Sequence, residues 1–296
     1  MKYEFIAMSR QNWPVAVMCE ILEVSRSGYY DYVKTQAAED STDELELLTR
    51  IKALHAETGQ CYGSRRMTRA LQAEGYQVMS GVGLTLGRHR VRRLMQEAGV
   101  SVKRRSTRKP QTTDSRHGYG VAPNVLNREF DVNKPNEAWV GDITYLWTQE
   151  GWLYLAVLLD LFSRKVVGWS LSSHVDAELV KGALEMAIGR RHPEAGLIHH
   201  TDRGSQYAAH AYRDMLREHG MVCSMSGKGD CLDNAVAERF FGSLKRERTS
   251  HRYYETRQEA RDDVVDYIEM FYNSTRLHSY LGYMSPNAYE KMPRAA

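Results

Sequence analysis

Three carboxylates are the residues of this 296-residue chain best suited to chemistry. Asp142 lies within Ala138 to Trp147, a run rich in aromatic and β-branched residues that predicts a buried strand. An unpaired carboxylate in such a strand costs several kcal/mol, and a bound metal ion is a good candidate to neutralise it. Asp202 follows a short apolar strand and two histidines, and Glu238 lies on a predicted amphipathic helix.

The spacing of these carboxylates is a stronger indication of function than any one of them alone. An aspartate after a strand is usually a turn or capping residue, and a glutamate on an amphipathic helix is usually a solvated side chain. Fifty-nine residues separate Asp142 from Asp202, and thirty-five separate Asp202 from Glu238. On the last helix, for which Asp233 or Asn234 is the expected N-cap, Glu238 shares a polar stripe with Asn234 and Lys245.

Four motifs surround these residues in order along the chain: Gly141–Tyr145, His200–Tyr207, Asp233–Phe241 and Asn273–Pro286. The Asp, Asp, thirty-five residues, Glu spacing is similar to that of the DDE integrase/transposase superfamily, and the motifs closely resemble OrfB-type transposases of the insertion-sequence-three family. Lys245, seven positions after the glutamate, matches a basic residue of that family, whereas Leu277 stands where a proline is expected.

The resemblance implies a DNA transposase that cleaves insertion-sequence ends and transfers the freed strand to target DNA by metal-dependent phosphoryl transfer. Asp142, Asp202 and Glu238 would be both catalytic residues and metal ligands. They would bind two Mg²⁺ ions, for which Mn²⁺ should substitute, because such sites take oxygen ligands. The implied partners are DNA, further copies of the chain in a dimer or higher oligomer, and an upstream OrfA-type partner or frameshift fusion.

Two other function classes stay open. A ribonuclease-H-like nuclease would use the same carboxylates to cut rather than to join nucleic acid. A non-enzymatic helix-turn-helix DNA-binding protein, such as a repressor, would account for the basic helical first third but has no use for three spaced carboxylates.

The elements expected to position the site form an α/β, ribonuclease-H-like core with a mixed five-stranded sheet flanked by helices. Three strands form an antiparallel meander that starts with the Asp142 strand, and helices then alternate with strands. An all-α, helix-turn-helix-like region precedes this core. The expected segments are 1–40 and 44–100, both helical and helix-turn-helix-like, a basic linker 101–135, the catalytic core 136–250, and a C-terminal helix and tail 251–296.

Positive charge is concentrated although the net charge is only +3. A predicted helix near residue 90 carries four arginines opposite its apolar stripe, and the linker carries further basic residues, both of which favour phosphate contact. Whether the first helical segment and the aromatic, basic tail near residue 280 contact DNA or pack internally is open. The residues expected to contact DNA are Arg88, Arg92, Arg93, Arg104, Arg105, Arg203, Lys228, Asn234 and Lys245.

Several features narrow the class of protein. No apolar run approaches the ~18 residues of a membrane span, no signal peptide is evident, and the four cysteines form no CxxC pair. We therefore expect a cytoplasmic, nucleoid-associated bacterial protein with reduced thiols. Asp160 also ends a predicted strand but has no motif partners, and His199 and His200 are expected to orient or pack rather than to bind magnesium.

Overall fold

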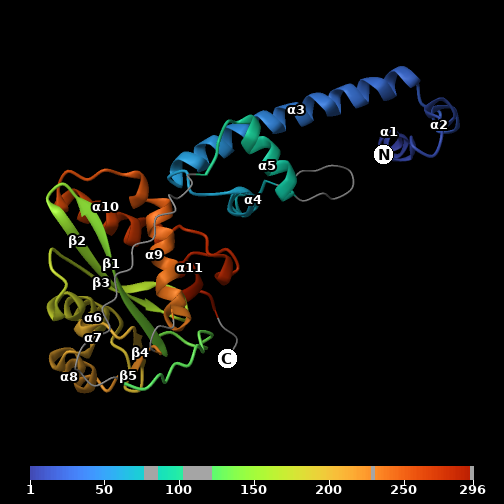
Figure 1. Cartoon of the computed structure of the whole chain (residues 1–296). Coiled ribbons are helices and arrows are strands. Elements are labelled where there is room, and N and C mark those ends of the chain that lie inside the picture. The colour runs from blue at the N-terminus through green and yellow to red at the C-terminus, as the bar shows by residue number, and fades with distance from the viewer. Residues whose placement is uncertain (77–85, 103–121, 228–230, 294–296) are drawn as a thin grey trace. The chain divides into compact units, whose positions relative to one another are not determined.

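The computed structural model describes residues 1–76, 86–102, 122–227 and 231–293, and it divides into two units, Met1–Val102 and Lys103–Ala296 (Figure 1). Each unit is described by itself. The predicted DNA contacts Arg104, Arg105 and Lys228 lie outside the described residues.

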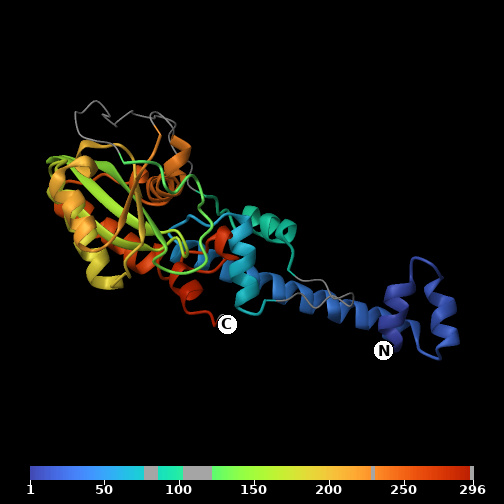
Figure 2. The ribbon, with the colours of Figure 1, turned by 90° about the horizontal axis from the view of Figure 1, so that it is seen from below.

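The first unit is all-α and is built along one 32-residue helix (Figure 2). Ser25 caps this helix, because its side chain accepts a hydrogen bond from the backbone N–H of Gly28 at 3.0 Å. Two short helices pack near the start of the long helix around Ile6, Cys19 and Tyr29, and two pack near its end. The helices are α1 (Lys2–Ser9), α2 (Val15–Ile21), α3 (Arg26–Glu57), α4 (Ser64–Ala73) and α5 (Arg88–Glu97).

The helices of this unit follow the sequence pattern with two differences. Residues of the predicted stripes, including Met67, Leu71 and Val91, are buried, and Gly99 ends α5 with a φ of +68°. The spacing of Leu45, Leu48 and Ile51 predicts a buried stripe on α3, but Leu45 is 66 % exposed and Leu47 is buried instead. The long helix also runs without interruption through residues 40–44, where we expected a boundary between helical segments.

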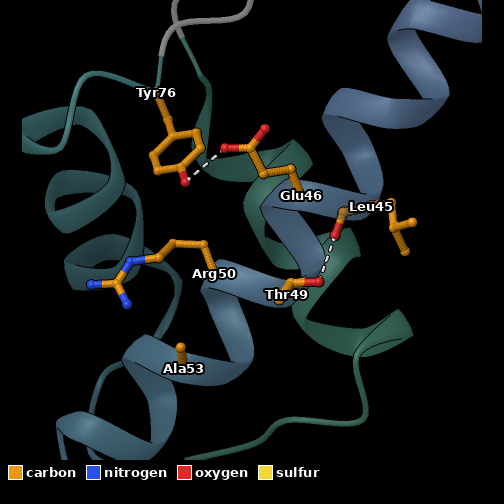
Figure 3. A pocket seen from close by; sticks show the side chains of 6 residues that line it. All are labelled: Leu45, Glu46, Thr49, Arg50, Ala53 and Tyr76. Carbon is orange, nitrogen blue, oxygen red and sulfur yellow. Dashed lines mark hydrogen bonds between the residues drawn. The ribbon is translucent and has the colours of Figure 1, made fainter.

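A hollow of about 430 Å³ lies beside α3 in this unit (Figure 3). Tyr76 closes one side by donating a hydrogen bond to Glu46 at 3.1 Å. The Arg50 guanidinium is bound by two carboxylates, Glu57 and Glu74, which together raise its pKa. The polar groups of the hollow are thus engaged with one another, and they join α3 to the end of α4.

The second unit contains a five-stranded mixed sheet with the order β3-β2-β1-β4-β5. The first three strands form the predicted antiparallel meander, and β4 and β5 are parallel to their neighbours. The strands are β1 (Ala138–Thr148), β2 (Gly151–Asp160), β3 (Val166–Ser172), β4 (Ile198–Thr201) and β5 (Val222–Met225).

Helices cover both faces of the sheet (Figure 1). The apolar residues of α6 (Ala177–Arg191), α7 (Ser205–Ala208) and α8 (His210–Glu218) pack on one face, and those of α9 (Ala235–Glu247) and α10 (Arg257–Asp266) pack on the other. The sequence predicts one helix from Ser205 to His219, but Ala209 adopts an extended ψ of 140° and divides it into α7 and α8. The predicted fold class is confirmed.

The chain after α9 packs back on the core, which answers the question left open for the tail. Thr256 caps α10 as the sequence predicted, and α10 passes into a π-helix, Tyr267–Tyr272. Arg276 then inserts beside α9 with only 4 % exposure, and the short helix α11 (Pro286–Glu290) follows. Among the described residues, no helix is long and apolar enough to cross a membrane.

Candidate active site

Asp142 and Asp202 come together through the register of the parallel pair β1 and β4. Val140 is paired with His200, and β4 ends at Thr201. Continued for two residues, this register places Asp142 level with Asp202 at the point where the two strands part. Side chains that are level in neighbouring strands project from the same face. Asp142 shares its face of β1 with Val140, which packs toward α9.

Glu238 is placed by the packing of α9 on that face. Phe240 and Leu244 are fully buried in the same core as Val140, whereas Glu238 is exposed in the first turn of the helix. Asn234 occupies the N-cap position as expected but makes no capping hydrogen bond. Its buried Nδ2 instead donates to the carbonyl oxygen of Gly141 at 3.1 Å, which ties the start of α9 to the residue before Asp142.

The electrostatics of Asp142 show that the three carboxylates form one cluster. Burial raises the pKa of Asp142 well above its usual range, and the charges of Asp202 and Glu238 raise it further. The Ile143 backbone N–H, which donates to Asp142 Oδ1 at 2.8 Å, and the Lys245 cation act in the opposite direction. The three predicted catalytic residues and Lys245 are therefore brought together by the fold.

The packing around Asp142 and Asp202 is close at Gly141. A Cβ on Gly141 would lie 2.8 Å from the end of the Leu158 side chain and 3.2 Å from the Thr201 methyl group, so a larger residue would require these side chains to shift. Asp202 Oδ1 accepts a hydrogen bond from the backbone N–H of Gly204 at 2.9 Å, which fixes the turn after β4. Arg203, a predicted DNA contact, donates from Nε to the carbonyl oxygen of Ser226 at 2.7 Å.

The chemistry of this cluster suits a divalent cation. Three carboxylates supply the oxygen ligands that Mg²⁺ and Mn²⁺ take, and their mutual repulsion at Asp142 is what a cation relieves. Within the described part of the chain, however, no three His, Cys, Asp or Glu side chains already stand close enough to share a metal ion. The donor set fits the metal, and binding requires the side chains to draw closer.

Lys245 and Tyr145 extend the site along β1. The Lys245 Nζ lies 4.9 Å from the centroid of the Tyr145 ring, a cation–π contact that holds the half-buried lysine beside the carboxylates. A cation at this position can meet a phosphate that enters the site.

The predicted DNA contacts in the first unit lie on α5. Arg88 and Arg92 are exposed, and Arg88 Nε approaches Ser64 Oγ at 3.4 Å. Arg93 is also exposed and forms an ion pair with Glu44. The buried face of α5 consists of Val91, Leu94 and Met95.

Asp160 and the two histidines of β4 are buried and bonded within the core. Asp160 is fully buried, accepts hydrogen bonds from the backbone of Asn136 and Phe162, and pairs with Arg191 at 3.0 Å. His199 and His200 pack in the core: His199 Nε2 lies 2.9 Å from the Tyr212 hydroxyl, and His200 bonds serines of and beside β5.

We expect acid to destabilise the second unit through His199. Burial lowers the pKa of His199 from 6.5 to about 4, so the unfolded chain binds more protons than the folded one between these values. His199 should therefore lower the stability by about 3 kcal/mol as the pH drops through this window, and His200, whose pKa burial likewise lowers to about 4, should lower it further. Urea unfolding from pH 7 to pH 4 measures the fall, and His199→Gln, which stays neutral, should make it clearly less steep. An equally steep fall in the variant would contradict this assignment.

Tyr207 is a residue of the site that lies in one of the sequence motifs but is not among the predicted site residues. It is 2 % exposed, and its hydroxyl has no hydrogen-bond partner within the described ranges. Burial raises its pKa, and the charges of Tyr212, Asp142 and Asp202 add to the effect, so the ring lies close to both aspartates. Only the position of Tyr207 three residues into the helix after β4 could have indicated this role.

Comparison with known proteins gives matches over most of the chain. Two family models described as "Integrase core domain" match residues 132–231 and 238–293, and one described as "HTH-like domain" matches residues 42–109. The insertion element IS600 31 kDa protein of Shigella sonnei is 42% identical over 274 residues, covering 93% of this chain and 97% of that protein. Transposase InsF for insertion sequence IS3A of Escherichia coli (strain K12) is 38% identical over 293 residues and 98% of each chain.

Solved structures of integrases are also similar. A chain of the simian T-cell lymphotropic virus intasome, solved in complex with PP2A regulatory subunit B56 gamma, superposes with a TM-score of 0.47 and 15% sequence identity. The match covers 83% of this chain and 76% of that chain.

Proposed function

The chain belongs to the insertion-sequence-three family of transposases and is an enzyme with an integrase core, and we propose that Asp142, Asp202 and Glu238 are its catalytic residues. Its reaction would be metal-dependent cleavage at insertion-sequence ends followed by transfer of the freed strand to target DNA. The observation that carries the proposal is the convergence of three carboxylates from distant parts of the chain, expressed in the raised pKa of Asp142.

The three carboxylates would hold two Mg²⁺ or Mn²⁺ ions. When bound, such ions lower the pKa of the attacking hydroxyl or water and stabilise charge on the leaving oxygen. Phosphoryl transfer otherwise requires positioning, since the attacking and leaving oxygens must lie in line. Asn234, predicted to contact DNA, is only 5 % exposed and bonded to Gly141, so it would act by fixing the backbone beside Asp142, whereas Lys245 would bind a phosphate of the DNA end. No covalent protein nucleophile is assigned.

DNA would be the partner of both units. The exposed arginines of α5, Arg88, Arg92 and Arg93, would bind the phosphate backbone without reading sequence. Transposition joins two DNA ends at one target, so two or more copies of the chain would act together. An upstream OrfA-type partner or fusion would complete recognition of the terminal repeats.

The test uses a branched DNA that mimics the product of strand transfer. Incubated with Mg²⁺ or Mn²⁺, the chain should reseal the branch, and chelation of the metal should stop the reaction. Glu238→Gln should slow resealing by about a hundredfold, since the amide keeps one ligand oxygen but loses the charge. Binding of the same DNA, measured by fluorescence anisotropy, should not change, because Glu238 is not proposed to contact phosphate.

Glu178→Gln is the matched control. Glu178 is likewise exposed in the first turn of a helix of this unit, and the variant should reseal at the wild-type rate. Wild-type rates for Glu238→Gln would remove Glu238 from the site. Metal-dependent cutting without any joining would favour the nuclease, and metal-independent binding without reaction, in the fused product as well, would favour the repressor.

A further inference from the structure

A line of aromatic side chains runs along one face of the β1–β2 hairpin. Tyr145 is paired across the strands with Tyr154, and Trp147 is paired with Trp152. Residues directly opposite in antiparallel strands, and residues two apart in one strand, share a face. The four residues, called the aromatic ladder below, therefore form one surface.

The ladder begins in the core and ends in solvent. Tyr154 packs against the core that α6 covers, and Tyr145 is half-buried. Trp147 and Trp152, one pair farther along, are 55 % and 43 % exposed. Indole rings are rarely left this exposed in pairs unless they contact a partner, because burying them is strongly favourable.

The ring geometry leaves surface available for stacking. Trp152 meets Trp147 with centroids 4.8 Å apart at 74° and meets Tyr145 at 5.1 Å and 88°. In such edge-to-face contacts one ring offers only its edge, so its own faces stay uncovered by that neighbour. Flat, exposed aromatic faces are the surfaces on which proteins stack nucleic acid bases.

The ladder and the carboxylates lie on opposite faces of β1, because Tyr145 and Trp147 are an odd number of residues from Asp142. They meet at the edge of the strand, where Lys245, whose charge acts on Asp142, lies over the Tyr145 ring. β1 pairs with β4 only as far as Val140, which leaves the edge of β1 from Asp142 onward without a strand neighbour among the described residues. DNA can therefore follow this edge from the carboxylates to Trp147.

The outer end of the ladder carries charged groups of both signs, which favours a polar partner over an apolar protein surface. Arg257 donates from Nε to the carbonyl oxygen of Trp152 at 3.1 Å, which holds its guanidinium beside the hairpin turn. Glu150, in that turn, accepts from the Arg257 backbone N–H at 2.8 Å. With Lys245 at the inner end, cations flank the exposed indoles at both ends, an arrangement suited to phosphates on either side of a stacked base.

We propose that Trp147 and Trp152 bind unpaired DNA bases by stacking and so hold open the frayed DNA end whose phosphate reacts at the carboxylates. The inference rests on the proposed function, because it takes the DNA end as the occupant. Trp147 is five residues beyond Asp142, about 17 Å along the strand at about 3.3 Å per residue. Stacked bases rise about 3.4 Å each, so the stacked base lies about five nucleotides from the reacting phosphate.

The test compares two DNAs of one sequence, a blunt duplex and the same duplex with five unpaired nucleotides at one end. Affinities of the full chain are measured by fluorescence anisotropy in the presence of EDTA, so no reaction occurs. The wild type should prefer the tailed duplex. Trp147→Ala should reduce this preference about tenfold, equivalent to about 1.4 kcal/mol, and Trp147→Phe should retain most of it.

Trp13→Ala is the matched control, since Trp13 is a 64 % exposed tryptophan of the other unit. Any effect of Trp13 on general DNA affinity is common to both DNAs and cancels in the ratio of the affinity for the tailed duplex to that for the blunt duplex. Equal thermal unfolding midpoints for the Trp147 variants and the wild type would show that the hairpin is intact. A 2-aminopurine base at the fifth tail position should be quenched by the wild type and not by Trp147→Ala.

A wild-type preference in Trp147→Ala, or no preference in the wild type, would overturn the stacking surface. The resealing reaction of the wild type and of Glu238→Gln is measured in a separate assay. Loss of preference in Trp147→Ala together with no resealing by the wild type or by the fused product would overturn the proposed enzyme site and still support base stacking.

Discussion

Replacing Asp142 by asparagine is expected to abolish resealing of the branched DNA and, at the same time, to stabilise the metal-free protein. The loss should be at least about a thousandfold, because removing the proposed shared metal ligand would forfeit several kcal/mol of charge stabilisation in phosphoryl transfer. The gain arises because burial and two neighbouring carboxylates make the charged form of Asp142 costly in the folded state. Asparagine keeps the shape and removes the charge.

The sign of the stability effect follows from the raised pKa. A carboxyl group whose folded pKa exceeds its unfolded value destabilises the fold above the folded pKa, and the penalty disappears as the pH falls through it. In EDTA at pH 8, Asp142→Asn should therefore melt about 3 °C or more above the wild type, the shift that about 1 kcal/mol gives in a domain of this size. Near the unfolded pKa the two proteins should converge.

The matched control for this variant is Asp176→Asn. Asp176 caps α6 by accepting from the Leu179 backbone N–H at 3.0 Å, and asparagine caps equally well, so neither activity nor melting should change. Mn²⁺ should raise the melting temperature of the wild type and of this control but not of Asp142→Asn. Resealing by Asp142→Asn at more than a tenth of the wild-type rate would remove Asp142 from the catalytic set.

Arg276→Met is expected to destabilise the second unit by about 3–5 kcal/mol. Arg276 and Glu247 are 4 % and 7 % exposed and form a two-point ion pair, with both N–O distances 2.7 Å. The Tyr267 hydroxyl, from the π-helix, also donates to Glu247 at 2.8 Å. Removing the arginine leaves the buried carboxylate with only the exposed Arg246 guanidinium, 3.9 Å away, and the fold must accept the cost of desolvating it or protonate the group.

Urea unfolding followed by tryptophan fluorescence measures this effect. Adding Glu247→Leu to Arg276→Met should recover most of the loss, since an apolar pair of similar volume avoids desolvating charge. Arg217→Met is the control, because Arg217 forms its ion pair with Asp214 on the surface and should lose no more than about 1 kcal/mol. An equal, small loss in both arginine variants would show that the buried pair does not stabilise α9.

The fold was predictable from sequence because its elements follow local patterns. The β-branched and aromatic runs of β1 to β3 and the spaced apolar residues of α9 mark their elements without tertiary information. Local patterns gave no reason for the break at Ala209, where no proline or glycine interrupts the helical run. They also misplaced Leu45, since both Leu45 and Leu47 are apolar and only packing selects which is buried.

The carboxylates of the candidate site could be predicted from the sequence, but the residues that pack and hydrogen-bond around them could not. The spacing of Asp142, Asp202 and Glu238 indicated the cluster, but spacing says nothing of the Asn234 bond to the Gly141 carbonyl or of Tyr207 beside the aspartates. The solvent exposure of Trp147 could likewise not be predicted, because a tryptophan in a strand is expected to be buried. Such features depend on which surfaces the tertiary fold leaves open.

The ion pair of Arg276 with Glu247 also has a consequence for the order in which the chain is made. A ribosome adds about 5–20 residues per second, so Asp142 is synthesised roughly ten seconds before Arg276. Until then α9, which carries Glu238, lacks the cation that allows Glu247 to be buried. A nascent or truncated chain that stops short of Arg276 would contain Asp142, Asp202 and Glu238 and yet would lack the ion pair that stabilises the helix carrying Glu238. The docking of α9 therefore depends on residues that are synthesised after it.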